Sequence, residues 1–226
     1  MKIFVITILI VFINCIIPSK VLADSNEEIN LPLPKLEGKM SVEEALAKRR
    51  SRRVFKDQSL TIEIISQLLW SAQGITENRR GFRTAPSAGA TYPLDIYLVV
   101  GKDRLEHLKA GVYHYNPFRH SVKNITDGDQ RRELARACLA QRFIEDAPVS
   151  LIITAEFSRI TNRYGKIGIY YAYIEAGHVG QNIYLQVESL GLGTVTVGAF
   201  YEREVSKVLG LPEQHIPLCV MPIGYY

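Results

Sequence analysis

The residues best suited to bind a ligand form one short cluster, Arg49-Arg50-Ser51-Arg52-Arg53. Guanidinium groups present planar, paired N–H donors that match phosphate oxygens, and a serine hydroxyl adds a short neutral donor. The cluster therefore predicts a site for the phosphate of a small ligand. A run of cations is also typical of a solvated surface or a nucleic-acid patch. The formal net charge of only +4 argues against a dedicated nucleic-acid binder, so we expect no nucleic-acid partner.

Two further stretches of small residues could lie against a flat ligand. One is the loop from Arg83 to Pro93, rich in Ala, Ser, Thr and Gly, and the other is Gly198-Ala199-Phe200, which follows an expected strand. Small side chains allow close approach and leave backbone N–H groups free to bind. Either stretch could also be a plain exposed loop. Together with the arginine cluster, they indicate a flat, phosphorylated cofactor.

Other common catalytic patterns are missing from the sequence. It has no Gly-x-Ser-x-Gly, His-Glu-x-x-His or Cys-x-x-Cys motif, and its five histidines lack the spacing of metal ligands, so no metal site is expected. Gly191-Leu192-Gly193 ends an expected helix, whereas the glycine motif of a dinucleotide-binding fold begins one. Glu175 and His178 are expected to be structural polar groups with no catalytic role.

Residues 1–23 have the features of a cleavable secretory signal peptide. Lys2 precedes an apolar run over 3–17, and Val21 and Ala23 occupy the minus-three and minus-one positions of a cleavage site. We therefore expect an exported protein, periplasmic or secreted, without stable membrane insertion. An uncleaved membrane anchor is the alternative.

The remaining chain is long enough for one sizeable domain. We expect an extended N-terminal arm over residues 24–40 and a single ligand-binding domain over residues 41–226. Cys138 and Cys219 lie in apolar surroundings and are expected to be buried thiols, although export would permit a disulfide.

The arginine cluster must be positioned by a short helix that begins at the capping box Ser41-Val42-Glu43-Glu44. The arginines then lie at the C-terminal end of the helix, so their side chains and the following loop have to hold the anion. Apolar periodicity predicts further helices over 61–73, 130–139, 166–190 and 202–209, and strands over 94–100, 112–115, 121–125, 149–155, 194–197 and 216–221. The irregular alternation indicates an α+β fold with one mostly antiparallel central sheet flanked by helices. The helix over 166–190 is apolar nearly all round, so its own domain or a partner subunit must enclose it.

Six segments, in order along the chain, resemble the FMN-dependent nitroreductase superfamily, and most closely its SagB/ThcOx-type dehydrogenase branch. They are Arg49-Arg50-Ser51-Arg52-Arg53-Val54-Phe55, Pro86-Ser87-Ala88-Gly89-Ala90-Thr91-Tyr92-Pro93, Glu175-Ala176-Gly177-His178-Val179-Gly180-Gln181-Asn182, Gly191-Leu192-Gly193-Thr194, Val197-Gly198-Ala199-Phe200 and Met221-Pro222-Ile223-Gly224. The resemblance implies non-covalent FMN, a nitroreductase-like fold and a homodimer with its active sites at the subunit interface. The helix over 166–190 resembles the central dimer helix of that family.

The resemblance also assigns expected roles to individual residues. Arg49, Arg50 and Ser51 match positions that hold the phosphate and ribityl chain. Arg53 matches the basic residue near flavin N1 and O2, where a fixed cation stabilises the negative charge of the reduced ring. Gln141 matches, less closely, a polar side chain at the pyrimidine edge.

A second set of matches concerns the flavin ring. Gly198 and Ala199 match backbone groups near N5 and O4. The loop that reaches the flavin from the partner subunit is matched by Pro86, Ser87, Ala88 and Gly89. The resemblance implies that the flavin itself carries out the redox chemistry. Tyr164 is the one side chain that we consider as a catalytic candidate.

Two departures from the family pattern stand out. The chain ends Gly224-Tyr225-Tyr226, where relatives often carry a basic residue that helps to hold phosphate. Azoline-oxidising members tend to show Lys-Tyr before the long helix, and the corresponding pair here is Arg163-Tyr164. Because Arg stays charged at neutral pH, it cannot act as a base, which weighs against azoline oxidation by that route.

The expected function is therefore FMN-dependent hydride transfer through flavin N5, from a donor such as NAD(P)H to a small organic acceptor such as a nitroaromatic or a quinone. A peptide or azoline dehydrogenase, or an oxygen-using flavin oxidase, is the first alternative. A non-catalytic FMN-binding protein is the second.

Overall fold

The computed structural model describes residues 28–226, and the expected signal peptide lies outside them. One seven-stranded antiparallel sheet forms the centre of the molecule, in the order β1-β6-β5-β4-β7-β9-β8. Its strands are β1 (Glu28–Asn30), β4 (Leu94–Val100), β5 (Gly111–Asn116), β6 (Ser121–Asp127), β7 (Val149–Ala155), β8 (Gly193–Thr194) and β9 (Ile216–Gly224). The central strand β7 is buried along its whole length because helices cover both faces of the sheet.

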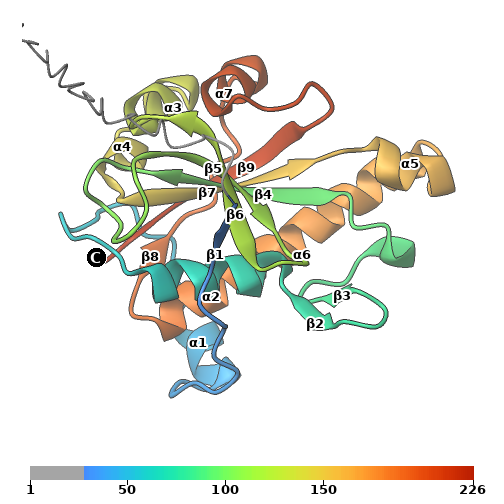
Figure 1. Ribbon diagram of the computed structural model, residues 1–226, viewed down its shortest axis with the longest axis horizontal. Helices are drawn as coiled ribbons and strands as arrows, with labels where there is room; N and C mark the ends of the chain where they lie inside the picture. The colour runs from blue at the N-terminus through green and yellow to red at the C-terminus, as the bar shows by residue number, and fades with distance from the viewer. Residues whose placement is uncertain (1–27) are drawn as a thin grey trace, which may run out of the picture.

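Two helical layers enclose the sheet (Figure 1). On one face, α2 (Ile62–Gln73) and α6 (Ile167–Ser189) pack on the larger core. On the other, α3 (Arg131–Ala137), α4 (Phe143–Asp146) and α7 (Glu202–Leu209) enclose the smaller core. The predicted α+β architecture, with a mostly antiparallel sheet flanked by helices, is confirmed.

The arm that precedes the domain adds an edge strand to the sheet. Residues 28–30 pair antiparallel with β6, and the Glu28 carboxylate accepts hydrogen bonds from Asn116 (2.9 Å) and Ser121 (2.6 Å). Farther along the arm, the Lys35 amide donates to Gln67 Oε1 at 2.8 Å. These bonds fix the extended segment against both the sheet and α2.

Three local features differ from the sequence prediction. The loop after α2 contains a small hairpin of β2 (Ile75–Glu77) and β3 (Phe82–Arg83), followed by a 3-10 turn, η1 (Ala88–Ala90). A separate helix, α5 (Ser158–Tyr164), precedes α6 and ends at Gly165, whose φ of 63° breaks the helix. Neither segment has a regular apolar period from which it could have been predicted.

The predicted strand over 194–197 is interrupted. Only Gly193–Thr194 pairs with β9 as a strand, and Val197 makes a single bridge to Val220. The reason is that the Thr196 amide donates to the Tyr184 hydroxyl at 2.8 Å, away from the strand ladder. The prediction of one continuous strand was therefore wrong.

Both described cysteines are free and buried, as predicted, and the sheet separates them. Cys138 belongs to the smaller core and Cys219 to the larger one. Burial raises the pKa of each thiol to about 12, so neither is a ready nucleophile. Among residues 28–226, no helix combines the length and apolar character needed to cross a bilayer. The same residues contain no cluster of three or more His, Cys, Asp or Glu side chains fit to hold a metal ion.

Candidate cofactor site

The arginine cluster lies where α1 (Val42–Lys48) ends. The Ser41 hydroxyl accepts a hydrogen bond from the Glu44 amide at 3.1 Å, which confirms the predicted cap. The chain then becomes extended, Ser51 forms a parallel bridge with Thr194, and the Arg52 amide donates to the Thr194 carbonyl at 2.8 Å. The short helix and strand β8 thus hold the cluster at one edge of the sheet.

Tyr184, near the C-terminal end of α6, makes polar contacts with both the arginine cluster and the loop after β8. Its hydroxyl shares a hydrogen bond with Ser51 Oγ (3.1 Å), and the Arg49 guanidinium lies 5.0 Å from its ring centroid. Through the bond from Thr196 described above, it also connects α6 to the loop after β8. Tyr184 is not among the site residues predicted from the sequence. The only available signal was a tyrosine near the end of an otherwise apolar helix.

The cluster has the charge expected of an anion site. Within residues 28–226, no Asp or Glu forms an ion pair with any of its four arginines, which are Arg49, Arg50, Arg52 and Arg53. Two buried polar atoms, Arg52 Nε and Thr194 Oγ1, lack a hydrogen-bond partner. Unpaired guanidiniums beside unsatisfied polar atoms fit a bound phosphate, because phosphate oxygens can accept from several donors at once.

The cluster is not uniformly available to a ligand. The Arg50 guanidinium turns back and donates to the Ala47 and Arg49 carbonyls at 3.0 and 2.8 Å. The Arg52 guanidinium stacks 3.8 Å from the Tyr226 ring centroid. The residues that follow Gly224 therefore contact the cluster through an aromatic ring.

A second group of predicted residues lies beside the cluster. The Gln141 side chain donates to the Ala199 carbonyl at 3.1 Å. The Arg53 guanidinium lies 6.0 Å from the ring centroid of Phe143, which is two residues after Gln141. A Cβ atom added at Gly198 would meet no other atom within 4 Å. Gln141 and Ala199 are thus joined directly, Arg53 lies near the same short helix, and the backbone at Gly198 is open to an approaching group.

The third predicted group, the loop from Pro86 to Gly89, lies elsewhere. Arg163 donates to the Gly89 carbonyl at 3.0 Å, and a Cβ at Gly89 would lie 2.5 Å from the Tyr164 hydroxyl. Tyr164 in turn packs edge-on against Tyr171, with ring centroids 5.4 Å apart. The loop therefore belongs to the N-terminal end of α6.

The two ends of α6 are far apart. Tyr171 contacts the loop group and Tyr184 contacts the arginine cluster, so at 1.5 Å per residue they are separated by about 20 Å along the helix axis. Figure 1 shows α1 and α5 near opposite ends of α6. One chain brings the arginine cluster together with Gln141 and Ala199. The loop runs along α6 from Asn182, whose side-chain amide donates to the Thr84 carbonyl at 3.3 Å, to Tyr164 beside Gly89, so its Gly89 end is the part that lies far from the cluster.

Glu175 lies between these ends, buried behind the loop. Its side chain is 2% exposed, and neither carboxyl oxygen makes a hydrogen bond within 3.5 Å. Burial raises the pKa of the Glu175 carboxyl to about 7, while Ser87, Gln73 and Arg83 act in the opposite direction. The expected structural role of Glu175 therefore includes contact with Ser87 of the predicted flavin loop.

The fold and the arginine cluster together define a class of α+β protein with a concentration of positive charge, suited to a phosphorylated cofactor, at the edge of an antiparallel sheet. A crystal structure described as a nitroreductase from Ralstonia eutropha has the same fold, with a TM-score of 0.77 and 30% identity over 89% of this chain and 90% of that one. The family model for the nitroreductase family matches residues 46–225. The chain belongs to this family.

Two curated relatives agree with this assignment. A nitroreductase homologue of Methanocaldococcus jannaschii is 46% identical over 202 residues, which cover 88% of this chain and 97% of that protein. The NADPH-flavin oxidoreductase of Vibrio harveyi is 29% identical over 114 residues, 46% of this chain and 47% of that protein.

Proposed function

We propose that this protein is an FMN-dependent oxidoreductase that passes electrons from NAD(P)H to a small organic acceptor, in a site built by two copies of the chain. Family membership and flavin-using relatives support FMN as the cofactor and NAD(P)H as the donor. The observation that carries the proposal is the arginine cluster, which has no carboxylate partners within the described residues.

The residues present can hold the cofactor in a defined orientation. Arg49 and Ser51, both tied to Tyr184, would bind the phosphate, and Arg53 would face the ring edge that becomes negative on reduction. Gln141, held by the Ala199 carbonyl, would bind the polar end of the ring. FMN supplies the hydride chemistry when bound, and the protein supplies binding, orientation and a fixed positive charge.

The separation of the loop from the cluster supports a homodimer. The Gly89 end of the loop lies about 20 Å along α6 from Tyr184 and the arginine cluster, whereas a second copy of the chain could bring its own Pro86–Gly89 loop to that cluster. At its N-terminal end, near Tyr164, α6 exposes five large apolar side chains, those of Ile167, Ile169, Tyr170, Tyr173 and Ile174. Such a surface is typical of an obligate interface, which buries about 2,000 Å² or more.

The finer parts of the proposal rest on sequence. Membership of the SagB/ThcOx-type branch rests on the six ordered segments, and export rests on residues 1–23. For the acceptor, we propose nitroaromatics or quinones. Tyr164 is the one side chain proposed to touch a substrate, because its hydroxyl covers the loop at Gly89.

The activity can be tested with the mature chain, residues 24–226. We expect a yellow protein whose visible flavin bands bleach when NADPH is added anaerobically and return when a nitroaromatic or a quinone follows. Colourless protein that takes up no added FMN would refute the proposal. Yellow protein that dithionite reduces but NADPH does not would refute NADPH as donor and favour a binding protein or another donor.

Subunit complementation tests the composite site. One tagged chain carries Arg49→Ala and Arg53→Ala, and a second carries replacements in the Pro86–Gly89 loop. Each homodimer should lack activity, whereas the purified heterodimer should regain about half of it, because one of its two sites then has only wild-type residues. An inactive heterodimer, with both chains folded by circular dichroism, would show that each chain builds its own site.

A further inference from the structure

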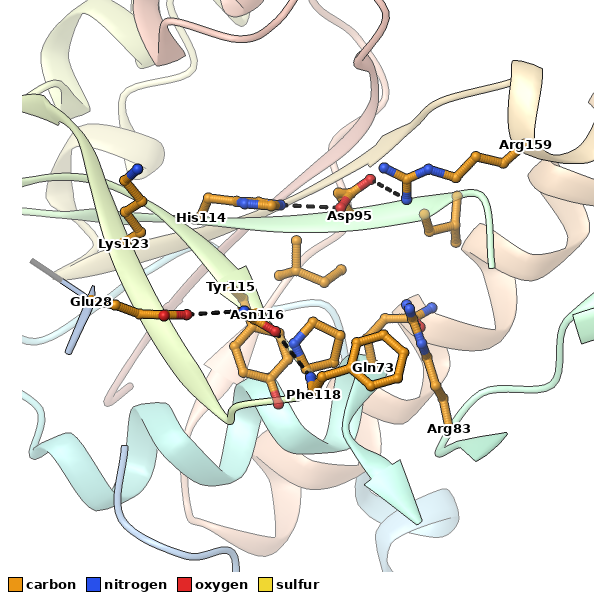
Figure 2. Close-up of a pocket in the computed structure, with 13 residues that line it drawn as sticks. Glu28, Gln73, Arg83, Asp95, His114, Tyr115, Asn116, Phe118, Lys123 and Arg159 are labelled. Carbon is orange, nitrogen blue, oxygen red and sulfur yellow. Dashed lines mark hydrogen bonds and ion pairs between the residues drawn. The ribbon is translucent and has the colours of Figure 1, made fainter. Parts of the chain in front are cut away.

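A cavity of about 400 Å³ lies apart from the arginine cluster, between strands β4 and β5 of the sheet and the β2–β3 hairpin (Figure 2). None of the residues from Arg49 to Arg53 lines it. Its polar lining includes Gln73, Arg83, Asp95 and Arg159, and its apolar lining includes Tyr115 and Phe118. A volume of this size is in the range of small-molecule sites, about 300–1,000 Å³.

The carboxylates of the cavity are already paired. Asp95 lies 3.1 Å from His114 Nε2 through one oxygen and 2.8 Å from the Arg159 guanidinium through the other. Glu28, at the rim, is paired with Arg119 at 2.6 Å. Neither acid therefore has an unpaired negative charge with which to attract a cationic ligand.

The donors of the cavity, in contrast, are incompletely used. Arg83 donates to Gln73 Oε1 at 2.9 Å, but its buried Nε atom has no hydrogen-bond partner. Gln73 is only 1% exposed, and its Nε2 amide also has none. Leaving two buried donors unsatisfied costs free energy, about 1–3 kcal/mol for each such group. Both atoms are buried on the side of Glu175, so the part of the Arg83 side chain that lines the cavity is what an oxyanion there would meet.

One internal acid competes for these donors. Glu175 lies behind Gln73 and interacts with Arg83, but its carboxyl oxygens make no hydrogen bond within 3.5 Å. Its pKa of about 7 leaves it partly protonated at neutral pH. Glu175 therefore does not fully balance the Arg83 charge, and Lys123 adds another cation to the lining with no ion pair among the described residues.

The apolar lining indicates the rest of the ligand. The Arg83 guanidinium lies between two aromatic rings, 4.4 Å from the Tyr92 centroid and 5.7 Å from that of Phe118. Phe118 is 71% exposed, and Figure 2 shows it on the same side of the cavity as Arg83. An exposed ring beside a guanidinium offers a stacking surface for a flat group.

We infer that this cavity binds a small aromatic carboxylate, with the carboxylate on the Arg83 guanidinium and the ring against Phe118. Arg83 and Tyr92 stand at the two ends of the segment that contains the Pro86–Gly89 loop. A bound ligand would therefore brace the base of that loop. The inference does not depend on the proposed oxidoreductase activity.

Benzoate is the probe, titrated into the mature protein by calorimetry, with benzyl alcohol as the neutral analogue of similar shape. We expect saturable binding of one benzoate per chain in this cavity, and at least tenfold weaker binding of benzyl alcohol. Arg83→Met should weaken benzoate at least tenfold, whereas Arg80→Met, on the same hairpin, should leave it unchanged. Phe118→Ala, at an exposed position that tolerates truncation, should weaken it several-fold.

Three results would overturn the inference. One is equal affinity for benzoate and benzyl alcohol, and another is benzoate binding that neither Arg83→Met nor Phe118→Ala weakens. The third is displacement of benzoate by equimolar inorganic phosphate, because the site would then recognise a bare anion. Benzoate binding at the flavin site is distinguished by Arg53→Ala, which should leave the Arg83-dependent binding intact. The Arg53→Ala control therefore tests the aromatic-carboxylate cavity separately from the proposed FMN site.

Discussion

The strongest prediction concerns the buried carboxyl of Glu175. Burial raises its pKa in the folded protein to about 7, from an ordinary value of 4.5. The folded state then binds the proton more tightly than the unfolded state does. The contribution of this proton to the free energy of unfolding is fully present below pH 4.5 and is lost progressively as the pH rises to about 7. A difference of about 2.5 pKa units corresponds to roughly 3 kcal/mol.

Glu175→Gln removes the ionisation while keeping the shape of the side chain. Between pH 5 and pH 8.5, the wild-type free energy of unfolding should fall by about 2.5 kcal/mol relative to that of the variant. The stability of the variant relative to the wild type should therefore be about 2.5 kcal/mol higher at pH 8.5 than at pH 5. At any single pH, the difference in free energy of unfolding between the two proteins also depends on the hydrogen bonds that the new amide makes with Ser87 and Gln73.

Urea unfolding at both pH values, at one fixed protein concentration, measures the effect. Glu204→Gln, at an exposed position on α7, controls for the loss of one negative charge. The difference between the two variants isolates the contribution of burial. If Glu175→Gln changes the free energy of unfolding equally at pH 5 and pH 8.5, Glu175 does not take up a proton on folding and the reasoning from burial is refuted.

Three further predictions concern the cofactor site. Arg53→Ala should lower the reduction potential of the flavin or weaken FMN binding about tenfold, which is about 1.4 kcal/mol of binding free energy. If both the potential and the affinity are unchanged, Arg53 does not lie at the ring edge. Tyr184→Phe should weaken FMN binding and lower the free energy of unfolding by about 1 kcal/mol, because the bonds to Ser51 and to the backbone are lost; equilibrium unfolding with and without FMN decides this. Gly89→Ala should weaken FMN binding in fluorescence titrations, since φ is 61° there and the new Cβ would crowd Tyr164; wild-type affinity would show that the loop does not contact the flavin.

The sequence by itself predicted the features that depend on local chemistry. The capping box fixed the start of α1, and with it the position of the arginine cluster at the end of that helix. Apolar periodicity located α2, α6 and α7, and the run Val149–Ala155 was correctly predicted as a strand buried on both faces. The ordered family segments predicted the fold before any packing was known. Such signals are readable because they involve residues close together in the chain.

Tertiary structure decided the features that depend on distant contacts. The Tyr184 hydroxyl takes the Thr196 amide and so ends a strand that local pattern would continue. The pKa of Glu175 is raised by desolvation, which depends on the elements packed around it. The rise of α6 places Tyr171, which packs on Tyr164 at the Gly89 end of the loop, about 20 Å from Tyr184, which contacts the arginine cluster. Residue types and spacing predicted both segments because such motifs are local in the chain, whereas only the packing along α6 decides where each segment lies.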